Sequence, residues 1–160
     1  MTTYQSQISL PEGTITKKVK VNRNRTNKEA VKVTGRVQYL NDTVVAEMPS
    51  GSEEEIEIHF IPFKKQISPD NLDLEVDELG FKFVDPVALC AANEQDPDFA
   101  NEHPNVTQWR DKKGKSCYLI FVCCFGDGRA MKIDTTVGSV DDDWYEYLLA
   151  ACVPKIILSN

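Results

Sequence analysis

The chain has 160 residues, of which 18 are basic and 25 acidic, so its formal net charge is −7. Hydrophobic residues make up 41% of the chain and charged residues 27%. This composition excludes collagen-like, coiled-coil and wholly disordered proteins. No window approaches the roughly 18 to 20 unbroken apolar residues of a membrane-spanning helix, so no membrane is expected among its partners. The length predicts a single domain over residues 1–160.

The first 40 residues predict a pair of strands. In residues 14–21 isoleucine and valine alternate with lysine, and in residues 30–40 valine and tyrosine alternate with polar side chains. Side chains alternate between the two faces of a strand, so each segment is expected to have one buried face. We predict that the two segments pair as a basic β-hairpin over residues 14–40, with residues 22–27 at its tip.

The middle of the chain predicts further short strands separated by turns. Alternating apolar residues mark these strands at 43–48, 55–60, 72–76 and 81–83. A short helix is predicted over residues 86–92, because Asp85 suits the N-cap and Pro86 the first helical position.

The last third predicts a buried strand and a helix. Residues 117–125 are apolar throughout, which is typical of a central strand covered on both faces. A Gly-Asp-Gly turn leads into another strand over residues 129–137. Ser139 begins a capping-box pattern, after which apolar residues recur at helical spacing, so we predict an amphipathic helix over residues 140–152. Residues 156–158 are expected to add a last strand.

Together these elements predict a β-rich α+β fold. It would be an antiparallel sandwich or open barrel with one short helix and a C-terminal amphipathic helix.

Cysteine usage and the N-terminus indicate a non-secreted protein. The number of cysteines is odd and their spacing suggests no pairing, while three of them lie in apolar segments where a free thiol behaves as a small hydrophobe. The first ten residues lack the sections of a secretory signal. We expect a cytoplasmic protein, or part of a virion assembled in the cytoplasm. The five cysteines are Cys90, Cys117, Cys123, Cys124 and Cys152.

Basic residues are concentrated near the N-terminus. Residues 14–36 carry eight lysines and arginines against one acid, Glu29, which gives this segment a charge of +7 and the rest of the chain −14. On the predicted hairpin, six of these cations would share the outward face and the tip. The predicted contact patch consists of Lys18, Lys20, Arg23, Arg25, Lys32 and Arg36.

This charge layout predicts a non-enzymatic protein that binds a macromolecule. The basic hairpin is expected to contact an acidic surface of another protein or of a second copy of the chain, which would use both the basic and the acidic parts of the sequence. Structural components of viruses or phages and inhibitors of host defence proteins are examples of such proteins. The alternative is contact with nucleic-acid phosphates, although residues 14–36 offer no aromatic ring for stacking. The acidic remainder could also imitate phosphates and block a nucleic-acid-binding protein. A solvated face whose lysines protect an edge strand explains the pattern equally well.

A metal-dependent nuclease is a minor alternative. Pro97-Asp98 and the later pair Asp111 and Lys113 match a loose pattern in which two carboxylates hold a metal and a lysine positions water. Residues 111–114 predict a turn, however, and so short a pattern arises readily by chance. His59 is expected to face solvent, and no metal site or cofactor is predicted.

Overall fold

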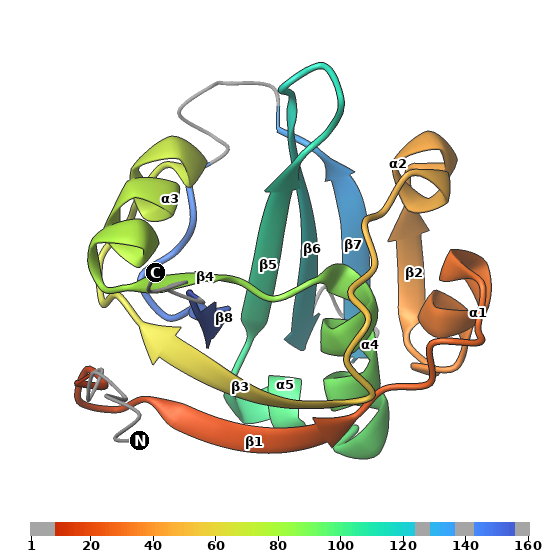
Figure 1. Cartoon of the computed structure of the whole chain (residues 1–160), viewed down its shortest axis with the longest axis horizontal. Coiled ribbons are helices and arrows are strands. Elements are labelled where there is room, and N and C mark those ends of the chain that lie inside the picture. The colour runs from red at the N-terminus through yellow and green to blue at the C-terminus, as the bar shows by residue number, and fades with distance from the viewer. Residues whose placement is uncertain (1–8, 124–128, 137–142, 156–160) are drawn as a thin grey trace, which may run out of the picture.

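One open, mixed sheet of eight strands organises the protein (Figure 1). The computed structural model describes residues 9–123, 129–136 and 143–155. Along the sheet the strands follow the order β1-β3-β8-β5-β6-β7-β2, and β4 pairs with β8 beside this path. The strands are β1 (Ile15–Lys20), β2 (Val37–Leu40), β3 (Glu55–Pro62), β4 (Phe81–Phe83), β5 (Asn105–Arg110), β6 (Ser116–Cys123), β7 (Arg129–Thr135) and β8 (Leu149–Pro154).

Five helices are found in the described ranges of the chain. They are α1 (Asn27–Lys32), α2 (Asp42–Ala46), α3 (Pro69–Glu78), α4 (Pro86–Gln95) and α5 (Phe99–Glu102). None of these helices is long and apolar enough to cross a membrane.

The predicted β-rich α+β class is confirmed, with one open sheet in place of a sandwich or barrel. Most neighbouring strands are antiparallel, and the exceptions are the parallel pairs β2–β7 and β5–β8. In Figure 1 β1 and β3 run at a steep angle to β5, β6 and β7, so the sheet is strongly twisted. The ends of this path are β1 and β2, each hydrogen-bonded to one named strand only.

The two faces of the sheet bury separate cores. The first core lies beneath α4 and includes Phe60, Leu89 and Phe121, each fully buried. The second core lies on the opposite face, where α3 supplies Leu72 and the segment before β8 supplies Trp144. Because both cores rest on the same sheet, its central strands must be apolar on both faces.

Strand β6 confirms the central position predicted for residues 117–125, as far as Cys123, but not the covering on both faces, because Ile120 and Val122 are only partly buried and Cys123 is exposed. It lies between β5 and β7, sends Leu119 and Phe121 into the first core and directs Tyr118 toward the second. Residues 124–125 are outside the described residues.

The predicted basic hairpin over residues 14–40 is wrong. Strand β1 pairs with β3, whereas β2 pairs with β7 at the other end of the sheet. Helix α1 separates them, and it begins with a capping box in which the Thr26 side chain accepts a hydrogen bond from the amide of Glu29. The alternating valines of residues 30–40 therefore predicted a strand that begins only at residue 37.

Two other predicted strands are helices. Residues 43–48 fall largely in α2, where the Asn41 side chain caps the helix by accepting from the amide of Val44. Residues 72–76 lie within α3, which buries Leu72 and Val76 but leaves Leu74 62% exposed. Positions i and i+4 share a helix face, and the sequence pattern fits that period as well as the strand period.

The predicted C-terminal helix over residues 140–152 is also wrong in its described part. Residues 149–154 form β8, which lies between β3 and β5 and also pairs with β4. The segment Ala150 to Cys152 is almost fully buried in this position, as a strand covered on both faces requires. Residues 139–142, which would have started the helix, and the expected strand at 156–158 lie outside the described residues.

The helix predicted over residues 86–92 is confirmed as the longer α4. Its N-cap, Asp85, accepts a hydrogen bond from the amide of Ala88 at 3.0 Å. The same carboxylate receives two bonds from Arg23, at 2.8 and 3.1 Å, with both side chains mostly buried. Asp85 therefore joins the start of α4 to the chain segment after β1.

We expect Asp85→Ala to lower the free energy of unfolding by about 2 to 4 kcal/mol, because it removes a helix cap and leaves Arg23 unpaired. Urea denaturation measures the change. Asp85→Asn is the control, because it retains the capping oxygen and should lose only part of this stability. If Asp85→Ala unfolded at the same urea concentration as the wild type, Asp85 would not have this stabilising role.

Candidate binding groove

The six basic residues predicted to form one contact patch are distributed over several surroundings. Arg23 binds Asp85, and Arg25 binds Glu94 through two hydrogen bonds of 2.7 and 3.2 Å. Both arginines are thus held by carboxylates of the same chain.

Lys18 and Lys20 are the two members of the predicted patch that share a surface, as exposed residues of β1. In the β1–β3 register Lys18 lies opposite Glu57, and Lys20 lies opposite Glu55. Opposite charges across neighbouring strands attract one another. Much of the charge asymmetry in the sequence is therefore compensated within the folded molecule.

The remaining two residues lie elsewhere. Lys32 is exposed in the last turn of α1. Arg36 is only 6% exposed, with its guanidinium 5.6 Å from the ring centre of Phe121. Burial lowers the pKa of Arg36, and Arg129 lowers it further. Arg36 is a buried residue and does not extend a surface patch.

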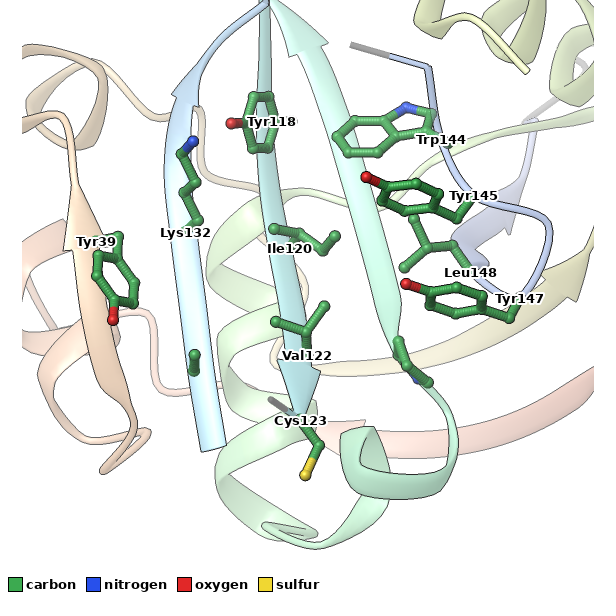
Figure 2. A pocket seen from close by; sticks show the side chains of 12 residues that line it. Tyr39, Tyr118, Ile120, Val122, Cys123, Lys132, Trp144, Tyr145, Tyr147 and Leu148 are labelled. Carbon is green, nitrogen blue, oxygen red and sulfur yellow. The ribbon is translucent and has the colours of Figure 1, made fainter. Parts of the chain in front are cut away.

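A groove of about 450 Å³ lies on the face of the sheet that carries the second core (Figure 2). On this face α3 and the segment before β8 cover the part of the sheet near β8. The side chains over β6, β7 and β2 are left partly open. The groove therefore begins where this cover ends. Its volume is in the range of small-molecule and peptide-anchor pockets.

The floor of the groove is built from cross-strand rows. Tyr39 of β2 lies opposite Lys132 of β7, and Lys132 lies opposite Ile120 of β6. The next row consists of Ala130 and Val122, and Val37 lies beside Ala130 at the sheet edge, outside the groove lining. Because residues two apart on a strand share a face, the two rows form one continuous apolar surface interrupted by a single lysine.

The wall beside β6 is aromatic. Tyr145 and Tyr147 stack with ring centres 5.6 Å apart and planes 3° from parallel, and they are 58% and 59% exposed. Tyr39, on the opposite side of the groove, is 48% exposed. Figure 2 shows these tyrosines on the two sides of the β6 and β7 side chains. All four tyrosines in the described part of the chain line the groove.

Trp144 fixes this wall to the body of the protein. Its indole nitrogen donates to the side-chain oxygen of Gln108 at 2.8 Å, and its ring meets Tyr118 edge to face at 5.1 Å. Gln108 in turn donates to the backbone oxygen of Pro69 and to Asp73, both in α3. The groove wall therefore rests on a buried hydrogen-bonded network, which favours a preformed site.

Among the described residues lining the groove, Lys132 is the only charged one. It is exposed and lies between Tyr39 and Ile120 in the sheet register. The arrangement suits an apolar or aromatic group placed between the tyrosines, with an anionic group near the lysine.

The residues of the nuclease-like pattern lie apart. Asp98 pairs with Arg129, which lies opposite Cys123 at one end of β6. Asp111 is at the turn before the other end of β6, where its carboxylate accepts from the amides of Lys113 and Lys115. Within the described ranges, no three His, Cys, Asp or Glu side chains are grouped closely enough to hold a metal ion.

Three of the four cysteines among the described residues lie in the protein interior. Burial raises the pKa of the Cys90, Cys117 and Cys152 thiols, an environment that disfavours the reactive thiolate. Cys123 is exposed at one end of the groove.

Sequence reasoning did not identify this groove. It assigned Trp144, Tyr145 and Tyr147 to a helix and expected residues 117–125 to be covered on both faces. Three aromatic residues within four positions were an available signal, because tyrosine and tryptophan are enriched at binding surfaces. Whether β6 remains partly open, by contrast, depends on the packing of distant segments.

No protein-family model matches the chain, and no curated protein or solved structure matches it either.

His59 contradicts the expectation that it faces solvent. It is buried in β3, with Nδ1 2.8 Å from the hydroxyl of Thr16 and its ring against the edge of Phe81. Burial lowers the pKa of His59, and Glu57 opposes this shift only in part.

We expect His59 to make folding stability depend on pH. Because the folded protein favours neutral His59, the unfolded chain binds the proton more readily, and stability is lost as the pH falls from about 6.5 through the lower pKa of the folded state. Urea denaturation at several pH values should show a larger loss for the wild type than for His59→Gln. Equal losses in the two proteins would contradict this assignment.

Proposed function

We propose that the chain is a non-catalytic protein-binding domain that holds an extended segment of a partner protein in the aromatic groove. The observation that carries this proposal is the exposed pair Tyr145 and Tyr147 facing Tyr39 across an apolar floor. Rigid aromatic side chains supply much of the binding energy at protein interfaces, because they offer a large contact area at little cost in conformational entropy.

The groove also indicates the chemistry of the bound segment. An apolar or aromatic side chain would fill the space above Ile120 and Val122, in contact with the tyrosines. Lys132, the one charged lining residue described, would pair with a carboxylate of the same segment. An acidic partner was also expected from the sequence, but through different residues.

The basic residues near the N-terminus do not carry this proposal. Arg23 and Arg25 already bind Asp85 and Glu94, so a partner would have to displace carboxylates that are held at short distance. The tyrosines of the groove present exposed ring surface instead, since Tyr39, Tyr145 and Tyr147 are 48%, 58% and 59% exposed.

Nucleic acid is the alternative occupant, because bases also stack on tyrosine rings. Phosphate binding normally uses several cations, whereas the described groove lining contains Lys132 alone. Glu146 stands between the two stacked tyrosines in the sequence, and the net charge of the chain is −7. These charges favour a protein segment.

The proposal is tested by selecting binders from a library of random peptides displayed on phage, with the purified protein as bait. We expect the selected peptides to combine aromatic or aliphatic residues with acidic ones. Their affinity, measured by isothermal titration calorimetry, should fall about tenfold or more in Tyr147→Ala, a loss typical of an interface hot spot. Lys132→Glu should weaken the acidic peptides further.

Leu74→Ala is the matched control, because Leu74 is an exposed apolar residue of α3 outside the groove. It should leave peptide affinity unchanged. Selected peptides that bind Tyr147→Ala as tightly as the wild type would exclude the groove as their site. Binding of single-stranded oligonucleotides that is lost in Tyr147→Ala would replace the protein partner with nucleic acid.

A further inference from the structure

The two end strands of the path, β1 and β2, differ in how well they are protected against pairing with another strand. The edge strand β1 carries Lys17, Lys18 and Lys20, and lysines on an edge strand are a common means of preventing association. The other edge strand, β2, has the sequence Val-Gln-Tyr-Leu, without a charge or a proline. Its first three residues are exposed, and Val37 is 42% exposed.

Strand β2 is also complementary to itself. When two copies pair antiparallel with Gln38 opposite Gln38, Val37 of each copy lies opposite Tyr39 of the other. Directly opposite residues of an antiparallel pair point to the same face, so both Val–Tyr pairs would lie on the groove side of the sheet. Pairs of aromatic and β-branched side chains are among the favourable cross-strand neighbours.

Antiparallel pairing of β1 with a second copy of β1 is unfavourable. An antiparallel pair centred on Lys18 would place two Lys18 side chains directly opposite each other, and like charges in that position repel. Of the two end strands of the path, β2 is therefore the better suited to join copies of the chain, because it carries no cations.

We propose that two copies of the chain associate through antiparallel pairing of their β2 strands, forming one continuous sheet across a twofold axis. The axis is perpendicular to the sheet, so the aromatic grooves of both copies open on the same face, one on each side of the junction. A dimer of this kind could hold two segments of one partner together, and the linked sites would bind more tightly than either alone.

The short length of β2 determines the strength expected of this dimer. Four residues on each side provide few backbone hydrogen bonds, and small interfaces are typical of transient complexes. We therefore expect a monomer–dimer equilibrium that depends on protein concentration. The contacting residues are uncharged, so raising the salt concentration should not dissociate the dimer.

Sedimentation velocity over a wide range of protein concentration tests the proposal. The wild type should approach twice the monomer mass at high concentration, at both low and high salt. Val37→Lys should remain monomeric, because pairing would bring a lysine into the junction from each copy. Leu74→Lys is the control, since it adds the same charge on α3 and should dimerise like the wild type.

Hydrogen exchange provides a readout without substitution. The β2 amides of the wild type should become more protected as concentration rises, while those of β1 should not. A wild type that stays monomeric, a dimer that Val37→Lys leaves intact, or a dimer that high salt dissociates would overturn the proposal. Tyr147→Ala should still dimerise, and Val37 does not line the groove, so failure of dimerisation and failure of groove binding are separable.

Discussion

Burial of one face of β6 is the constraint on which the rest of the structure depends. Leu119 and Phe121 are fully buried in the first core, which requires α4 and its neighbours on that face. The opposite face offers a similarly apolar surface, but α3 and Trp144 cover only its part near β8. The side chains left partly open over β6, β7 and β2 form the floor of the groove, and the open edge of β2 borders the same region.

The ion pairs of the basic segment have a structural explanation within the fold. Arg23 reaches Asp85 at the start of α4, and Arg25 reaches Glu94 near the end of the same helix. Lys17 pairs with Asp96 just beyond it. The segment after β1 is thereby held along α4 by charges from distant parts of the sequence. A chain can therefore separate its charges strongly along the sequence and still present a largely compensated surface when folded.

The sequence predicted the elements whose local pattern agrees with their final environment. Strands β1, β3, β4, β6 and β7 and helix α4 were found, because alternation or a helix cap marks them directly. Helix α3 was missed because the spacing of Leu72 and Val76 fits either period, although Ser68 and Pro69 mark a helix start. Strand β8 was missed because burial between other strands overrode a helical pattern. Local sequence patterns could not predict the groove, because its position depends on which part of one sheet face is left uncovered by distant segments of the chain.

The central claim is that the tyrosine-lined groove is the binding surface of this protein. It is tested most directly by fluorine NMR of protein labelled with 3-fluorotyrosine, titrated with a short acidic peptide that contains phenylalanine. Tyr39, Tyr145 and Tyr147 should shift together in proportion to the peptide bound. Unchanged signals of these three tyrosines at saturating peptide would contradict the account.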